Sequence, residues 1–514
     1  MLKLLQQVFP SINKYRLFIL FQSLCAYLLV IVVSSWTFPL SVDSFHFITS
    51  ADQLIKGQGL TFSNFFVEIP SSDFLPVFLQ PPGYTLLIAG FKKIGIDTTT
   101  AAILIPRICY ICLPFLFFSI FRRIISNCQA VWASFICTFI FTCLSTALMA
   151  WSDIPYLCVS LIAIIGVFKI IESDFKVNGT FIVFAGLTTG TALLIRYTGT
   201  GLILAIGFTF VLACAIRLIP LKKAWSAAVY YVLGIIIIIT PYLIRNWLVF
   251  KNIQPFHLPP NHDSLLTVVS DYLTNLSQVL FAQPNGAVFV LIVIVGTCLV
   301  LIRYCKVLIR ENKLRFTNIL IIANYFIFNS LFLIYCRAQN FTEAINERYI
   351  IAFAWSLIAL IAVSVSLMID KQKSVGKRKV SAWIPILALI VFILIQSLCV
   401  VEEYYKQQKI TLLALKIQKH LYLIDQLPPD IVIVSNVADI TYYFAKRNVR
   451  LLGRYSPQDL INNLGTKRRF VVFLVKEGKY LSPFWSYLPV WDQSAGYRII
   501  SSDPEVDLLS PYYR

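Results

Sequence analysis

The chain has 514 residues, of which 58% are hydrophobic and only 13% are charged, and its mean hydropathy is +0.76. These values exclude a soluble globular fold for the chain as a whole and predict a polytopic membrane protein. The net charge of +19 does not indicate nucleic-acid binding, because Lys and Arg fall in short loops between apolar runs, where they set membrane topology.

The first apolar run, 17–38, follows Lys3, Lys14 and Arg16 and has no small-residue cleavage pattern, so it reads as an uncleaved first span. A polar loop over 39–100 comes next, with interfacial helices predicted from Asp43 to about Ile55 and over 83–91. Apolar runs of roughly 20 residues then recur, which is the length that crosses a bilayer as a helix. They predict about eleven spans in all, the others lying near 101–120, 129–150, 155–171, 180–195, 199–216, 225–243, 286–302, 317–335, 350–369 and 382–400.

Basic residues are concentrated in alternate loops, such as those carrying Arg122 and Arg123, Lys222 and Lys223, and Arg310 and Arg315. The positive-inside rule therefore predicts a cytoplasmic N-terminus, with the loop 39–100 and the tail outside. No G-x-x-x-x-G-K-[ST] phosphate loop is present in the sequence, which argues against an ATP-driven pump.

The tail after about residue 400 has ordinary globular composition. Its stretches "IVIVSN", "ADITYYFAKRN", "RRFVVFLVK" and "GYRIISSD" predict strand, helix, strand and strand. The predicted fold class is therefore an all-α polytopic membrane domain over 1–400 and a small extracytoplasmic α/β domain over 401–514.

Ionisable residues gather at the predicted outer ends of the spans, where they are costly and often functional. Asp43, His46 and Phe47 share one helical face just after the first span. Asp153, in "MAWSDIPYL", opens the fourth span. Either carboxylate could instead be a helix cap, and the two together could position a metal ion or an acceptor hydroxyl.

Three arginines on the same side, Arg196, Arg245 and Arg348, each lie at a predicted span end. Snorkelling anchors explain many such arginines. Converging on the side that is poor in positive charge, they would also suit a phosphate group, which guanidinium binds in bidentate fashion.

Four stretches resemble the polytopic glycosyltransferases of the GT-C fold, especially bacterial relatives of the protein O-mannosyltransferases and of the lipid A aminoarabinose transferases. They are "VDSFHFITSADQLIKGQGL", "LQPPGYTLLIAGFKKIG", "WSDIPYLCVSLIAI" and "TPYLIRNWLVFKNIQPF". Asp43 is followed by Ser44 where many relatives have a second acidic residue.

The resemblance implies an inverting transferase that moves a sugar from a polyprenyl-phosphate donor to a glycan, lipid or protein acceptor at the outer face of a bacterial cytoplasmic (inner) membrane. Asp43 would then be the general base for the acceptor hydroxyl or would position it, and Asp153 would assist. A divalent cation, Mg²⁺ or Mn²⁺, could be held by Asp43, Asp153 and His46. The lipid phosphate would be held by Arg196, Arg245 and Arg348 with Lys92 or Lys93.

Two other functions remain open from the sequence. A secondary transporter would have inverted repeats and charges at mid-span, and the third possibility is a lipid-carrier protein without catalysis. In all three cases the partners include membrane lipids and not nucleic acid.

Overall fold

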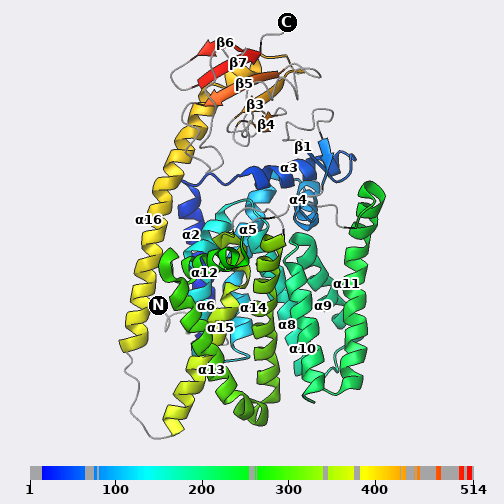
Figure 1. Ribbon diagram of the computed structural model, residues 1–514, viewed down its shortest axis with the longest axis vertical. Coiled ribbons are helices and arrows are strands. Elements are labelled where there is room, and N and C mark those ends of the chain that lie inside the picture. The colour runs from blue at the N-terminus through cyan, green and yellow to red at the C-terminus, as the bar shows by residue number, and fades with distance from the viewer. Residues whose placement is uncertain are drawn as a thin grey trace. The chain divides into compact units, whose positions relative to one another are not determined.

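The computed structural model describes residues 14–63, 74–77, 80–253, 261, 263–339, 345–374, 383–428, 430–435, 441, 445, 449–451, 470–475, 497–502 and 506–511. The chain divides into two compact units. We call residues 1–32, 78–84 and 103–401 the helical unit, and residues 33–77, 85–102 and 402–514 the second unit. Figure 1 shows the chain from N- to C-terminus.

Long helices make up most of the described chain. Their bounds are α2 Lys14–Ser34, α3 Val42–Ile55, α4 Gly83–Lys93, α5 Thr98–Phe121, α6 Asn127–Thr138, α7 Phe141–Leu148, α8 Asp153–Glu172, α9 Gly179–Ile195, α10 Gly199–Ala215, α11 Leu221–Phe250, α12 Leu265–Phe281, the 3₁₀ turn η1 Pro284–Gly286, α13 Ala287–Glu311, α14 Lys313–Gln339, α15 Glu347–Ser374, α16 Trp383–Lys419 and α17 Leu421–Asp425.

Among the described residues, seven helices are long and apolar enough to cross a membrane. The number becomes eight if α6 and α7, which are bent by 51° relative to each other, form one broken span. The helices α9 and α10 are apolar but shorter, at 17 residues each. A polytopic helical fold is therefore confirmed, while the count of eleven spans stays a prediction.

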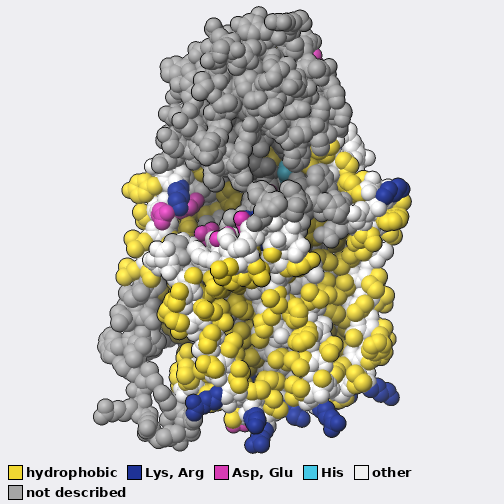
Figure 2. Space-filling view, viewed as in Figure 1, with side chains coloured by type: hydrophobic (Ala, Val, Ile, Leu, Met, Phe, Trp, Pro, Cys, Tyr) yellow, Lys and Arg dark blue, Asp and Glu magenta, His cyan; other side chains and the backbone are white. Residues whose placement is uncertain are grey.

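Small residues allow close and extensive contact between α9 and α11 in the helical unit. A Cβ added to Gly186 would lie 2.0 Å from the carbonyl oxygen of Tyr231, and one added to Gly234 would lie 2.2 Å from that of Val183. Glycine at both positions lets the two backbones touch, which is how small residues promote helix packing in membranes. Hydrophobic side chains cover the sides of this unit, and Lys and Arg gather at one end of it (Figure 2).

The helix α8 runs through the interior of the helical unit and defines its two ends. Of its 20 residues, 14 are buried. At 1.5 Å per residue the helix is about 30 Å long. We refer to the Asp153 end and the Glu172 end of the helical unit. The sequence predicts that the Asp153 end is the outer one.

The second unit contains α3, a short antiparallel ribbon and a five-stranded sheet. The ribbon pairs β1 Thr61–Ser63 with β2 Phe74–Pro76. The sheet has the order β4-β3-β5-β7-β6, with β3 parallel to β4 and β5, and β7 antiparallel to β5 and β6. The strand bounds are β3 Val432–Ser435, β4 Val449–Leu451, β5 Phe470–Val475, β6 Tyr497–Ser502 and β7 Val506–Pro511.

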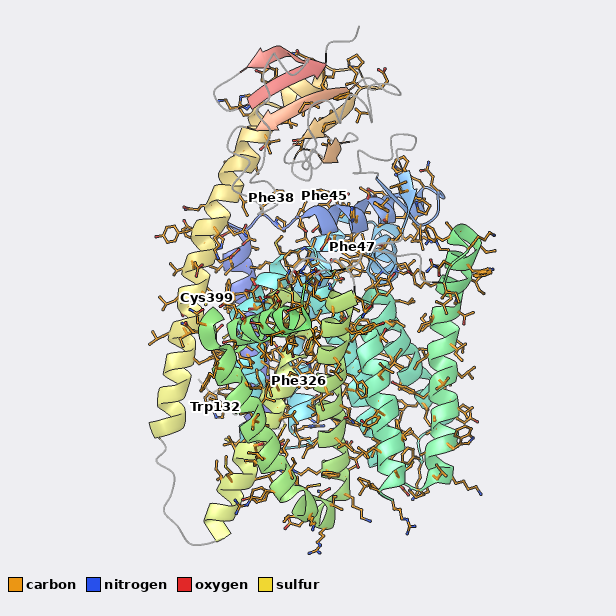
Figure 3. The ribbon with its side chains drawn as sticks, viewed as in Figure 1. Phe38, Phe45, Phe47, Trp132, Phe326 and Cys399 are labelled. Carbon is orange, nitrogen blue, oxygen red and sulfur yellow. The ribbon has the colours of Figure 1, made fainter. Side chains whose placement is uncertain are left out.

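The core of the second unit forms between the end of α16, α17 and the strands of the sheet. Ile417, Ile424 and Ile433 are fully buried in it, and Phe38 packs against it. Figure 3 labels Phe38 together with Phe45 and Phe47 of α3. Both α3 phenylalanines are buried. The aromatic residues just after the first span therefore fix the start of the polar loop within this unit.

The predicted strands of the tail coincide with β3, β5 and β6, whereas β4 and β7 were not predicted. The predicted helix over 438–448 lies outside the described residues except at Thr441 and Ala445. The α16 helix runs continuously past residue 400. The domain boundary there and the extracytoplasmic location of the tail remain predictions.

Candidate functional site

A buried carboxylate lies where α8 begins. Asp153 is the first residue of the helix, and its side chain is 1% exposed. The N-cap is Ser152, whose side chain makes no capping hydrogen bond, so the interpretation of Asp153 as the helix cap is wrong. A carboxylate in the first turn interacts favourably with the positive end of the helix dipole. Burial of such a charge nevertheless requires a partner.

The partner is Arg196, which ends the neighbouring helix α9. Its backbone is extended, at φ −148° and ψ 141°, and so leaves the helix path. One terminal nitrogen, Nη1, lies 2.8 Å from Asp153 Oδ2 and donates to Ser152 Oγ at 3.2 Å. The Arg196 guanidinium carbon also lies 5.4 Å from the ring centroid of Tyr349. Three contacts therefore fix this guanidinium, which is 19% exposed.

A second arginine joins this group from the start of α15. The guanidinium carbon of Arg348 lies 4.7 Å from the ring centroid of Trp151 and 4.8 Å from that of Tyr349, within the range of a cation–π contact. Its Nη2 donates to the Tyr349 hydroxyl at 2.8 Å. We call Trp151, Ser152, Asp153, Arg196, Arg348 and Tyr349 the arginine cluster. Tyr349 joins its two guanidinium groups.

The third predicted arginine, Arg245, lies in α11 among tyrosines. Its Nη1 donates to Asn246 Oδ1 at 2.9 Å. The hydroxyls of Tyr197 and Tyr242 are 2.8 Å apart. Burial, reinforced by Tyr242, raises the pKa of Tyr197, while the nearby charge of Arg245 lowers it. Tyr197 directly follows Arg196 of the arginine cluster, so the chain itself links Arg245 and its tyrosines to that cluster.

Tyr84 approaches the same carboxylate from α4 and is fully buried. Burial raises the pKa of its phenol, and the negative charge of Asp153 raises it further, so the hydroxyl stays protonated. The preceding residue must be glycine, because a Cβ on Gly83 would lie 2.6 Å from the backbone carbonyl of Leu194. This close approach holds the start of α4 against the end of α9.

The remaining candidates belong to the second unit. Asp43 lies in the first turn of α3, whose N-cap is Ser41, so Asp43 is not the cap. The ring centroid of His46 lies 4.8 Å from that of Phe62, and burial lowers the pKa of His46 to about 4 against the opposing effect of Asp43. Lys92 and Lys93 end α4 and are exposed. Lys92 Nζ lies 3.8 Å from Asp97 Oδ1.

Two of the three predicted metal ligands, Asp153 and His46, are engaged in other contacts. Within the described part of the chain, no three or more His, Cys, Asp or Glu side chains are grouped as ligands. The Asp153 carboxylate already binds a guanidinium, whose charge opposes a second cation there. The imidazole of His46 packs against a phenyl ring. We therefore derive no step through a metal.

The structure thus brings Asp153, Arg196 and Arg348 together and places Asp43, His46, Lys92 and Lys93 in the other unit. The sequence did not single out the tyrosines of the site, Tyr84, Tyr197, Tyr242 and Tyr349. A usable signal was nevertheless present. Both arginines of the cluster are followed directly by tyrosine, in "IRYTG" and "ERYII".

Residues 79–244 match the family model described as dolichyl-phosphate-mannose-protein mannosyltransferase. Comparison with curated proteins finds no match. ArnT from Cupriavidus metallidurans bound to undecaprenyl phosphate has a similar structure, with a TM-score of 0.54 and 10% identity, and the match covers 95% of this chain and 97% of ArnT. The apo oligosaccharyltransferase of Archaeoglobus fulgidus gives a TM-score of 0.59 at 12% identity, over 90% of this chain and 70% of that one.

The same archaeal oligosaccharyltransferase, AglB, in complex with an inhibitory peptide and a dolichol-phosphate, gives a TM-score of 0.51 at 11% identity, over 88% of this chain and 69% of that one. At these identities the structural likeness establishes the fold, and the family match covers the segment that contains Tyr84, Asp153 and Arg196. The chain therefore has the fold of ArnT and AglB, and residues 79–244 resemble the dolichyl-phosphate-mannose-protein mannosyltransferases.

Proposed function

We propose that the chain transfers a sugar from a polyprenyl-phosphate donor to an acceptor hydroxyl at the Asp153 end of the helical unit, on the outer face of a bacterial cytoplasmic membrane. The observation that carries the proposal is the arginine cluster, in which Arg196 and Arg348 are held at fixed positions by Asp153, Trp151 and Tyr349. The guanidinium of Arg348, supported by that of Arg196, matches the charge and geometry of a lipid phosphate. The undecaprenyl phosphate bound to ArnT and the dolichol-phosphate bound to AglB support this ligand class.

In the proposed reaction the acceptor oxygen attacks the anomeric carbon of the sugar as the bond from that carbon to the phosphate oxygen breaks. The polyprenyl phosphate leaves with the bonding electron pair, and the configuration at the anomeric carbon is inverted. Negative charge develops on the leaving phosphate, where Arg348 and Arg245 would stabilise it electrostatically. The proton of the acceptor hydroxyl would pass to the carboxylate of Asp43.

Asp153 has a different role in this proposal from the one that the sequence suggests. Its carboxylate is buried and paired with Arg196, so it is poorly placed to accept a proton from a substrate. We assign it the task of fixing the Arg196 guanidinium, which in turn contacts the ring of Tyr349. Asp153 is therefore a positioning residue, and Asp43 is the proposed base.

The test is sugar transfer by the purified protein, reconstituted in liposomes, from a panel of radiolabelled polyprenyl-phosphate sugars. We expect transfer by the wild type, with and without chelator, and loss of transfer in Asp43→Asn. The matched control is Asp52→Asn on the same helix, because an amide oxygen can still accept the 3.0 Å hydrogen bond from Thr98 Oγ1. Full activity of Asp43→Asn would refute its role as base. No transfer from any donor by folded wild type would favour a carrier or transporter.

A further inference from the structure

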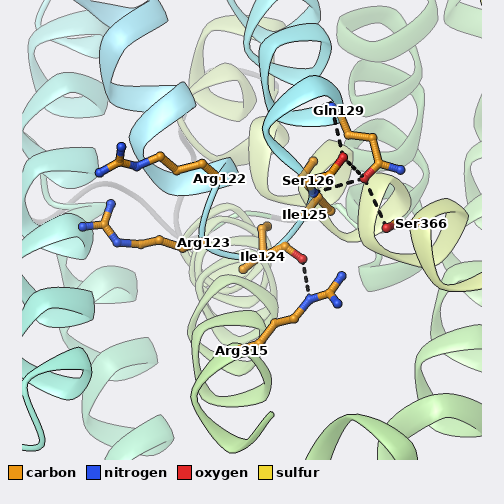
Figure 4. A pocket seen from close by; sticks show the side chains of 8 residues that line it. All are labelled: Arg122, Arg123, Ile124, Ile125, Ser126, Gln129, Arg315 and Ser366. Carbon is orange, nitrogen blue, oxygen red and sulfur yellow. Dashed lines mark hydrogen bonds between the residues drawn. The ribbon is translucent and has the colours of Figure 1, made fainter. Parts of the chain in front are cut away.

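A polar cavity lies at the Glu172 end of the helical unit, about 30 Å along α8 from Asp153. Its volume is about 390 Å³. Figure 4 shows the side chains that line it. They are Arg122, Arg123, Ile124, Ile125, Ser126, Gln129, Arg315 and Ser366. The position of the cavity is fixed by the ion pair between Arg123 Nε and Glu172 Oε1, at 2.6 Å.

The lining comes from several helix ends. Arg122 to Ile125 form the turn between α5 and α6, Ser126 is the N-cap of α6, Arg315 lies at the start of α14, and Ser366 lies near the end of α15. Among the described residues that line the cavity, none is acidic. With Arg123 neutralised by Glu172, Arg122 and Arg315 leave a charge of about two positive units without an acidic partner in the lining.

These two arginines retain donor groups without a hydrogen-bond partner in the part of the chain that the structure describes. Arg315 Nε donates to the carbonyl oxygen of Ile124 at 2.7 Å. This bond holds the guanidinium in place and leaves the two terminal nitrogens, which Figure 4 shows on the side of Ser366. Arg122 is exposed, and its guanidinium contacts the ring of Phe118 at 6.0 Å but makes no hydrogen bond within the described part of the chain.

Gln129 adds a further donor. The backbone N–H of Ser126 donates to Gln129 Oε1 at 3.1 Å, and the hydroxyls of Ser126 and Ser366 donate to the same oxygen at 2.8 and 3.2 Å. Because a backbone N–H can only donate, this contact fixes the accepting atom as oxygen. The amide oxygen is thus occupied, and the amide nitrogen remains as a donor. Arg315 and Gln129 therefore offer positive charge and donors on one side of the cavity, which is the requirement of a phosphate group, while Arg122 extends to the other side and adds to the positive charge around it (Figure 4).

We propose that this cavity binds the phosphate group of an anionic phospholipid in the leaflet at the Glu172 end. Lys and Arg gather at this end of the unit, below the hydrophobic belt that meets the acyl chains (Figure 2). Basic pockets between membrane helices on the cytoplasmic side are typical sites for acidic lipid headgroups. The site is separate from the proposed transferase site and does not depend on that function.

Native mass spectrometry of the full chain tests the proposal with phosphatidylglycerol as the probe. The variant Arg122→Gln/Arg315→Gln removes both open cations of the cavity. The matched control, Arg303→Gln/Lys306→Gln, removes two exposed charges of α13 that do not line it. We expect the wild type and the control to retain one lipid. The cavity variant should bind the lipid at least about tenfold more weakly, which is the effect of losing a charge-assisted hydrogen bond. The melting temperature without lipid checks that each variant is folded.

Equal lipid binding by the cavity variant and the control would overturn the proposal. A second arm uses inorganic phosphate alone, at millimolar concentration, and reads the melting temperature. We expect no stabilisation by free phosphate. Phosphate could instead stabilise the wild type but not the cavity variant, while phosphatidylglycerol binds both proteins equally. The natural occupant would then be a soluble phosphate compound, and the lipid assignment would be wrong.

Discussion

The ion pair between Asp153 and Arg196 can be tested by removing each partner in turn. In Arg196→Gln the carboxylate, which is 1% exposed, is left buried without a cation. In Asp153→Asn the remaining guanidinium is 19% exposed and can turn toward water. The two single variants should therefore differ in cost, with Arg196→Gln the more damaging.

The magnitude follows from the burial of the pair. Removing one member of a fully buried pair costs about 3–5 kcal/mol. The partial exposure of Arg196 reduces this range, so we expect about 3 kcal/mol for Arg196→Gln and about 1–2 kcal/mol for Asp153→Asn. The double variant should cost less than the sum of the two, with a coupling energy of about 1–2 kcal/mol, because the second substitution removes the group that the first left unpaired.

Reversible unfolding in mixed micelles, followed by tryptophan fluorescence during titration with sodium dodecyl sulfate, measures all three free energies of unfolding. Arg196→Lys belongs in the same series, since an ammonium can pair with Asp153 but lacks the planar group that lies near the ring of Tyr349. Costs that add to within about 0.5 kcal/mol would show that the two side chains do not interact. That result would refute the assignment of Asp153 as the residue that positions Arg196.

Three further predictions concern single positions. Burial lowers the pKa of His46 from 6.5 to about 4, so His46 stays neutral in the folded chain while the unfolded chain takes up a proton as the pH falls. The free energy of unfolding should therefore decline from about pH 6.5 to pH 4 by up to about 3 kcal/mol. His46→Gln should flatten the pH profile of the melting temperature. Gly83→Ala should cost about 1–3 kcal/mol, because its Cβ would lie 2.6 Å from the backbone of Leu194, whereas Gly90→Ala, which meets nothing within 4 Å, should be neutral or stabilising; equal melting temperatures would contradict this reasoning. Arg348→Lys should lower stability by about 1 kcal/mol, since a lysine loses the stacking of a planar group on two aromatic rings at 4.7 and 4.8 Å, and an unchanged unfolding transition would show that these contacts contribute nothing.

Hydrophobic run length was sufficient to locate the helices, because an apolar segment of about 20 residues has few alternatives to a membrane helix. It could not predict the break between α6 and α7, which lies within one apolar run at 129–150 and has no proline or glycine to mark it. It also missed α12, an amphipathic helix over Leu265–Phe281 that is not apolar enough to be read as a span. Periodicity identified three strands of the tail sheet, but β4 has only three residues, too few to show a period.

The candidate site was predictable in part, for a physical reason. Charged residues at membrane depth stand out against an apolar background, and Asp153, Arg196 and Arg348 were found in this way. Which charges pair is decided by helix packing, and the sequence contains no direct signal of it. Tyrosine is common in such chains, here 25 residues, so the tyrosines that contact the arginines could not be separated from those of the interfacial belt.

Arg196 and Arg348 show how an arginine that binds a ligand differs from one that anchors a helix at the membrane surface. An anchoring arginine extends its charge to water and keeps its rotamer freedom. Arg196 does not behave in this way, because Asp153, Ser152 and the ring of Tyr349 hold its guanidinium in one place. Its charge is also largely neutralised by Asp153, which makes it a rigid support for the cluster and leaves Arg348 as the stronger attraction for an anion. The expected order of sensitivity in phosphate binding is therefore Arg348 before Arg196, although the order in protein stability is the reverse.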